Sequence, residues 1–204
     1  MKRRALLLGG ALAAALARAQ VHTPAQPPGV ALAPTRWRAE IEALLDADRR
    51  SAPPLGAVLF VGSSTIRLWK GLEQDFAAQA PVVLRRGLGG SRLSEWPEFV
   101  PWLVTRYVPK QVIVYAGEND IAEGAQPAEV LAAFVRFVQA VQAERPGTPI
   151  AFVSIKPSPL RAAQAATMRE ANLLVQTWVL AQDGLDYIDV HTPMLDNDGR
   201  ARPE

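Results

Sequence analysis

Residues 57–67 read AVLFVGSSTIR, and this stretch decides the fold. Its first part is a continuous apolar run with two valines, which is typical of a strand buried on both faces of a parallel sheet. Gly62 permits a tight turn at the end of that run, and a helix is predicted to begin directly after it. A strand that passes straight into a helix indicates an α/β protein.

The same alternation continues along the chain. Four more runs with the character of buried strands cover residues 82–84, 111–116, 150–155 and 185–190. Segments with helical spacing separate them, and the clearest begins at Pro127, a favourable first-turn residue. Its apolar face comprises Val130, Leu131, Phe134, Val138 and Val141. Strands joined by crossover helices predict a parallel, doubly wound sheet.

Composition excludes several classes of protein. The 204 residues include no cysteine, which excludes a disulfide scaffold, an iron–sulfur protein, a cysteine-ligated zinc site and a cysteine nucleophile. The histidines number two, His22 and His191, too few for a histidine-rich metal site. Residues 1–19 hold four basic side chains and no acid, so the rest of the chain has a net charge of −2. We therefore expect no nucleic-acid partner.

Residues 1–19 have the pattern of a secretory signal peptide: a basic start, an apolar run and a small-x-small cleavage site. The run from Ala5 to Ala17 has 13 residues, fewer than the roughly 20 that a membrane-spanning helix needs. An uncleaved anchor is the alternative. We expect an exported bacterial protein, periplasmic or secreted, without a stable membrane span. Residues 20–35 contain four prolines and predict an extended linker, and residues 36–204 form the domain, which opens with a helix.

Polar residues follow three of the predicted strands, where doubly wound sheets place their functional sites. Ser64 stands at the start of a helix, a position that suits a nucleophile and equally an N-cap. Residues 87–90 read GLGG and fit neither a dinucleotide fingerprint nor a phosphate loop. Asn119 follows Gly117. A serine, a glycine N–H and a carboxamide that converge on one point would form an oxyanion hole.

These three motifs, Gly62-x-Ser64, Gly90 before Ser91 and Gly117-x-Asn119-Asp120, together resemble the SGNH hydrolases, also called the GDSL esterase/lipase family. The resemblance covers about residues 37–204. It implies a flavodoxin-like three-layer fold with a five-stranded parallel sheet of order 2-1-3-4-5. It also implies an ester hydrolase that needs no cofactor or metal, with Ser64 as nucleophile and Gly90 N–H, Ser64 N–H and the Asn119 amide as oxyanion donors. The letters GDSL stand for residues, with aspartate directly before the serine. In this sequence Ser63 takes the place of that aspartate.

The general base of that family is the histidine of an Asp-x-x-His motif, which is absent from this sequence. Ile188 precedes His191 by three residues, and Asp189-Val190-His191 therefore has the wrong spacing. With order 2-1-3-4-5 the fifth strand lies about 14 Å from the first, at roughly 4.8 Å per strand, whereas proton abstraction needs about 3 Å. We interpret residues 36–204 as a domain that is incomplete at its C-terminal end, and we expect little turnover.

Other functions stay open at this stage. A non-catalytic pseudoenzyme or a glycan- or acyl-binding module would use the same fold, and a flavodoxin-like nucleotide binder would share the sheet but lacks phosphate motifs. The substrate class is an ester of a small molecule, a glycan or a lipid. Glu118 and Asp120 are interpreted as residues that shape their loop. Asp196 and Asp198 have the spacing of an Asx turn.

Overall fold

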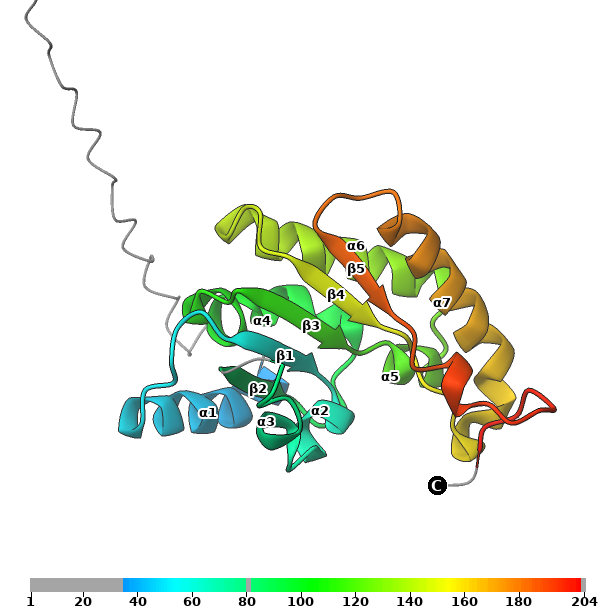
Figure 1. Cartoon of the computed structure of the whole chain (residues 1–204), viewed down its shortest axis with the longest axis horizontal. Helices are drawn as coiled ribbons and strands as arrows, with labels where there is room; N and C mark the ends of the chain where they lie inside the picture. Colours follow the sequence, from blue (N-terminus) through cyan, green and yellow to red (C-terminus); the bar gives the residue numbers. More distant parts are fainter. Residues whose placement is uncertain (1–34, 80–81, 203–204) are drawn as a thin grey trace, which may run out of the picture.

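The computed structural model describes residues 35–79 and 82–202 (Figure 1). The predicted signal peptide at 1–19, the linker up to residue 34 and His22 lie outside these residues. Within the described ranges, no helix combines the length and the apolar content that a bilayer crossing requires.

Five parallel strands form one sheet in the order β2-β1-β3-β4-β5, which confirms the predicted topology (Figure 1). The strands are β1 (Val58–Gly62), β2 (Val83–Gly87), β3 (Gln111–Tyr115), β4 (Ile150–Val153) and β5 (Leu185–Ile188). β4 and β5 each end two residues earlier than their apolar runs suggest. The residues that follow them, Ser154 and Asp189, take part in side-chain hydrogen bonds instead.

Strand β2 extends three residues beyond its predicted end, to Gly87. Apolar patterning missed this part because it contains Arg85 and Arg86. Arg86 is only 8% exposed, and it is accommodated by an ion pair with Asp48 and by a 2.8 Å hydrogen bond from its Nε to the Tyr107 hydroxyl. The Tyr107 hydroxyl in turn donates to Asp48 over 2.6 Å. A buried charge that is paired and hydrogen-bonded in this way is compatible with a strand interior.

The two faces of the sheet are covered unequally. On one face the large core unites strand residues with α1 (Arg38–Arg50), α4 (Trp96–Leu103), α6 (Pro127–Glu144) and α7 (Ala165–Val179). On the other face, a smaller core includes Phe60 and Ile113 with residues of α2 and α3.

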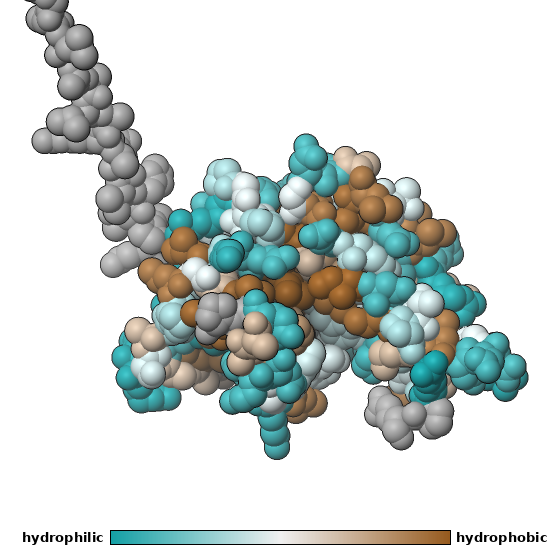
Figure 2. All heavy atoms as spheres, in the orientation of Figure 1, coloured by the Kyte–Doolittle hydropathy of each residue, from teal (hydrophilic) through white to brown (hydrophobic). Residues whose placement is uncertain are grey.

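Helices α2 (Ser64–Leu68) and α3 (Leu72–Asp75) are the described helices that contribute to that smaller core. Apolar residues consequently form a visible band across the middle of the view in Figure 2. α5 (Glu118–Ala122) is a short helix that follows β3. Among residues 35–79 and 82–202 there are also five short 3-10 segments, which span Thr35–Trp37, Leu93–Glu95, Thr105–Tyr107, Pro159–Gln164 and Thr192–Met194.

The three tyrosines of the chain give a test of this core at alkaline pH. Burial raises the pKa of Tyr107 to about 12 and that of Tyr187 to about 12, and burial also raises the pKa of Tyr115. In the unfolded chain these groups ionise near pH 10. Stability is therefore fully present below about pH 10 and is lost as the pH rises toward 12, because the unfolded chain releases its phenolic protons first.

We expect tyrosinate absorbance to appear only above about pH 11 in the native protein, and around pH 10 in urea. Parallel pH titrations of the native and urea-unfolded protein measure this difference. Tyr187→Phe serves as a control, because it removes the half-buried phenol and should reduce the total amplitude without moving the other two transitions. Coincident native and unfolded titration curves would contradict the buried environments of the phenols.

Candidate active site

The carboxyl ends of β1, β2 and β3 are level with one another. Gly62, the last residue of β1, pairs with Gly87 on one side and with Tyr115 on the other. The main-chain N–H of Ser63 donates to the Tyr115 carbonyl over 3.1 Å, and that of Leu88 donates to the Gly62 carbonyl over 2.9 Å. The segments that contain Ser64, Gly90 and Asn119 therefore leave the sheet at the same edge.

Two glycines allow α2 to begin this close to the sheet. Gly62 has a φ of +147°, and a Cβ there would lie 1.9 Å from the Tyr115 carbonyl oxygen. A Cβ on Gly87 would lie 2.4 Å from the main-chain nitrogen of Arg67 in α2. Ser64 is the first residue of α2 and is partly buried. The glycines thus fix the place of Ser64 relative to β2 and β3.

Gly90 differs from these glycines because it faces open space. Its φ is +84°, and a Cβ built on it would meet no heavy atom within 4 Å. The use of the Gly90 N–H as a donor stays a prediction, and the space beside its Cα would let a ligand approach the main chain closely.

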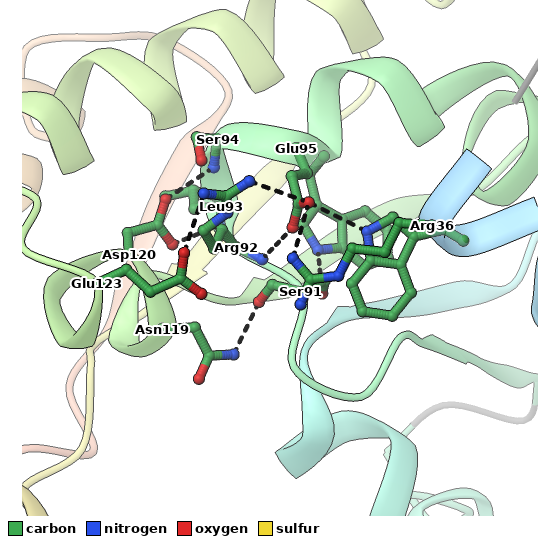
Figure 3. Close-up of polar contacts among 11 residues, drawn as sticks. Arg36, Ser91, Arg92, Leu93, Ser94, Glu95, Asn119, Asp120 and Glu123 are labelled. Carbon is green, nitrogen blue, oxygen red and sulfur yellow. Dashed lines mark hydrogen bonds and ion pairs between the residues drawn. The ribbon is translucent and has the colours of Figure 1, made fainter. Parts of the chain in front are cut away.

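The Asn119 side chain is oriented by the same turn. Its Nδ2 donates to the main-chain carbonyl of Ser91 over 2.9 Å (Figure 3). A carboxamide has two N–H donors, so this bond fixes its plane and leaves the second N–H for a ligand. Ser91 is fully buried, and its Oγ accepts a 3.1 Å hydrogen bond from the Trp96 indole.

Asp120 makes a second connection between the segment that follows β2 and the segment that follows β3. Asp120 is 4% exposed, and its carboxylate accepts the main-chain N–H of Leu93 over 2.6 Å and that of Ser94 over 3.0 Å (Figure 3). The sequence interpretation of Asp120 as a loop-shaping residue agrees with these contacts. The sequence did not reveal which backbone groups it would bind, nor that Ser91 would orient Asn119.

The outer side of the Gly90 turn is held by charged side chains. Glu95 lies 3.2 Å from Arg92 and 3.6 Å from Arg36, and Arg92 also contacts Glu123 at 3.0 Å (Figure 3). Burial raises the pKa of Glu95, but hydrogen bonds from Arg92 and Trp37 outweigh it, so the pKa lies below its usual value. Through Glu95 the turn is tied to the 3-10 segment Thr35–Trp37, whereas the Arg92–Glu123 pair is exposed to solvent and contributes little to holding it.

Glu118 lies beside Asn119 and is engaged by its own neighbours. The Tyr115 hydroxyl donates to one of its carboxylate oxygens over 3.1 Å, and Arg161 Nε lies 3.7 Å from the other. Tyr115 also contacts Thr65, the residue after Ser64. The carboxylate is thus part of a network that joins β3, α2 and the segment after β4.

His191 is not placed as a base for Ser64. Its ring is 6% exposed, and Nδ1 lies 2.9 Å from the Ile155 carbonyl, which requires the proton to be on Nδ1. Nε2 has no hydrogen-bond partner and is shielded from solvent. Asp189 does not orient the ring, because Nδ1 is hydrogen-bonded to Ile155 and Nε2 to no group; Asp189 instead accepts the main-chain N–H of Thr192 over 3.1 Å. His191 follows β5, three strands along the sheet from β1.

Metal ligation has no support within the described ranges, where no group of three or more histidine, aspartate or glutamate side chains could hold an ion. Asp196 forms the predicted Asx turn, since its Oδ1 accepts the main-chain N–H of Asp198 over 2.9 Å.

Comparison with known protein families identifies the family of this chain. The model of the GDSL-like lipase/acylhydrolase family matches residues 59–204. The chain belongs to this family. Comparison with curated proteins found no match.

Several solved structures share the GDSL-like fold. One, from Streptococcus pneumonia with a name that refers to platelet activating factor, has a TM-score of 0.70 and 19% identity over 81% of this chain and 80% of its own. A GDSL-like lipase from Bacteroides thetaiotaomicron has a TM-score of 0.65 and 17% identity, covering 79% and 83%. A lipolytic G-D-S-L protein from Veillonella parvula has a TM-score of 0.57 and 15% identity, covering 72% and 89%. These likenesses support the fold.

Proposed function

We propose that this GDSL-family chain is a carboxylic-ester hydrolase whose nucleophile is Ser64. The observation that supports this most is that β1, β2 and β3 end level with one another. The segments that contain Ser64, Gly90 and Asn119 follow these three strands and therefore start at the same end of the sheet. Asn119 is oriented by Ser91 so that one amide N–H remains available. The substrates are esters of small molecules, glycans or lipids.

The proposed reaction is acyl transfer in two steps. Ser64 Oγ forms a bond to the ester carbonyl carbon, and its proton passes to a base. The negative charge on the carbonyl oxygen is stabilised by the N–H groups of Gly90 and Ser64 and by the Asn119 amide. The bond to the alcohol then breaks, the alcohol takes up a proton, and water hydrolyses the acyl-serine to release the acid.

The activation of Ser64 is expected to be weak in this sequence. It contains no Asp-x-x-His, and His191 has a shielded Nε2 and follows β5 rather than β1. We propose that residues 1–204 on their own turn over ester slowly, because they contain no Asp-x-x-His motif to supply the base. Serine hydrolases that lose a triad member typically retain about 10³–10⁴-fold acceleration over water.

Residues 1–19 support a further part of the proposal, namely export from a bacterial cell. A basic start, a short apolar run and a small-x-small cleavage site are the three parts of a secretory signal peptide. Mass spectrometry of the protein recovered from a periplasmic fraction tests this proposal. Cleavage after Ala19 supports it, and an intact Met1 in the cytoplasmic fraction would contradict it.

Removing the carboxamide tests the oxyanion hole. We expect Asn119→Ala to lower the residual rate of acyl transfer from p-nitrophenyl acetate by about 10²–10³-fold, because one preorganised donor is lost. The measurement is p-nitrophenol release with buffer hydrolysis subtracted. Asn197→Ala, which changes the same residue type on an exposed turn, is the matched control. Equal rates in both variants would contradict a role for Asn119.

A second candidate function is a pseudoenzyme that binds acylated glycans without hydrolysing them. The shielded imidazole of His191 favours it, because no other imidazole is found among the described residues. This function predicts that binding of an acetylated oligosaccharide survives Ser64→Ala, with no acetate released by the unaltered chain.

A further inference from the structure

We propose that Asp120 is a positioning residue that sets the geometry of the oxyanion hole. The inference rests on the proposed function of Ser64 and Asn119. It concerns the contacts that join Ser91–Ser94 to Asn119–Asp120, which we call the donor clamp.

The donor clamp is a closed ring of short contacts. The Asn119 amide donates to the Ser91 carbonyl over 2.9 Å, and two residues later the Leu93 N–H donates back to Asp120 over 2.6 Å. Asn119 and Asp120 are adjacent in the chain, as are Gly90 and Ser91. The ring therefore joins the two proposed donors through only a few covalent bonds on each side (Figure 3).

Without the carboxylate, the ring would be held by the Asn119 amide alone. The turn that contains Gly90 has one internal hydrogen bond, from the Ser91 N–H to the Leu88 carbonyl over 3.1 Å, and no packing neighbour at the Gly90 Cβ position. Asp120 also accepts the Ser94 N–H, so its loss leaves two main-chain donors near the start of α4 without their acceptor. The Asn119 amide plane and the Gly90 N–H would then lose their mutual alignment.

Asp120 differs in this respect from the other acids of the loop. Glu123 is exposed and pairs with Arg92 on the solvent side, and Glu118 faces Tyr115 and Arg161. Only Asp120 among these three has both oxygens on main-chain N–H groups of the 3-10 segment Leu93–Glu95, which follows the turn that contains Gly90. Because Asp120 is buried and both of its carboxylate oxygens are hydrogen-bonded, its side chain has few alternative conformations and can fix the position of the main chain that it binds.

Asp120→Asn is the test, because an asparagine keeps the size but presents at most one acceptor oxygen. We expect the rate of acyl transfer at saturating p-nitrophenyl acetate to fall by at least about tenfold, within the roughly 10²-fold that a misplacement of about 1 Å costs. KM should change by less than about twofold, since ground-state binding does not use the oxyanion donors. Glu123→Gln is the matched control and should keep the rate.

A stability-matched control separates positioning from folding. Val141→Ala removes methyl groups from the buried face of α6, away from the donor clamp, and should lower the melting temperature while keeping the rate. Equal kinetics in Asp120→Asn and Val141→Ala would overturn the proposal.

NMR supplies a readout that needs no activity. We expect the Asn119 side-chain amide cross peaks and the Gly90 main-chain cross peak to shift in Asp120→Asn and not in Glu123→Gln. Unshifted peaks in Asp120→Asn would overturn the proposal. If Ser64→Ala turned over ester as fast as the unaltered chain, the proposed function would fail; shifted peaks in Asp120→Asn would still report the donor clamp.

Discussion

Ser64→Ala is expected to abolish formation of the acyl-serine from p-nitrophenyl acetate, so that the p-nitrophenol release that passes through residue 64 is lost. The acceleration of about 10³–10⁴-fold that impaired serine hydrolases retain comes from the oxyanion hole and substrate binding, whereas the proposed acyl transfer requires the Ser64 oxygen. Ser64 is the serine that begins α2 next to the end of β1, and alanine removes the attacking oxygen without altering the helix start. The rate of p-nitrophenol release is measured at several enzyme concentrations. The slope of rate against enzyme concentration is then compared between Ser64→Ala and the unaltered chain.

Two further variants serve as comparisons for Ser64→Ala. Ser51→Ala removes an exposed hydroxyl after α1 and should keep the rate of the unaltered chain. His191→Ala should also keep that rate, because the ring is engaged with Ile155. A rate lost in His191→Ala would show that this imidazole is the base and that its burial is relieved when ester binds. A rate retained in Ser64→Ala would remove Ser64 from the mechanism.

Gly62→Ala is expected to be the most destabilising single methyl addition near the site. The new Cβ would lie 1.9 Å from the Tyr115 carbonyl oxygen and 3.1 Å from Ile66, and the φ of +147° is unfavourable for an L-residue. Overpacking and backbone strain each cost about 1–3 kcal/mol, so we expect a loss of about 3 kcal/mol or more in the free energy of unfolding. Urea denaturation of the two proteins measures it.

Gly147→Ala is the matched control for that experiment. Gly147 also has a positive φ, of +75°, but a Cβ there meets no atom within 4 Å. We expect it to cost about 1–2 kcal/mol, which is the conformational penalty alone. Equal losses in the two variants would mean that β1 and β3 do not approach each other at Gly62 as described.

The fold was largely accessible from the sequence because its strands are apolar on both faces. Continuous apolar runs such as residues 57–62 and 111–116 are typical of buried parallel strands, and they can be recognised without knowing which residues pack against them. β2 is the exception, since Arg85 and Arg86 hide its second half. The ion pair of Arg86 with Asp48 joins residues far apart in the chain, and no local pattern predicts it.

The sequence predicted which residues make up the candidate site, but it did not predict the contacts between them. Ser64, Gly90 and Asn119 could be named because each follows its own strand. The Ser91 carbonyl that orients Asn119, and the two main-chain N–H groups that Asp120 accepts, are separated from their partners by more than 25 residues. Such bonds depend on how two loops meet at the sheet edge, which is decided by tertiary packing.

Mapping the residue that reacts with an alkyl fluorophosphonate tests the central claim most directly, because its phosphonyl oxygen occupies the place of the oxyanion. After prolonged incubation and digestion, we predict that mass spectrometry finds the phosphonyl group on Ser64, with slower labelling in Asn119→Ala and none in Ser64→Ala. Labelling at another serine, or labelling of Ser64 at the same rate with and without the Asn119 amide, would contradict the account.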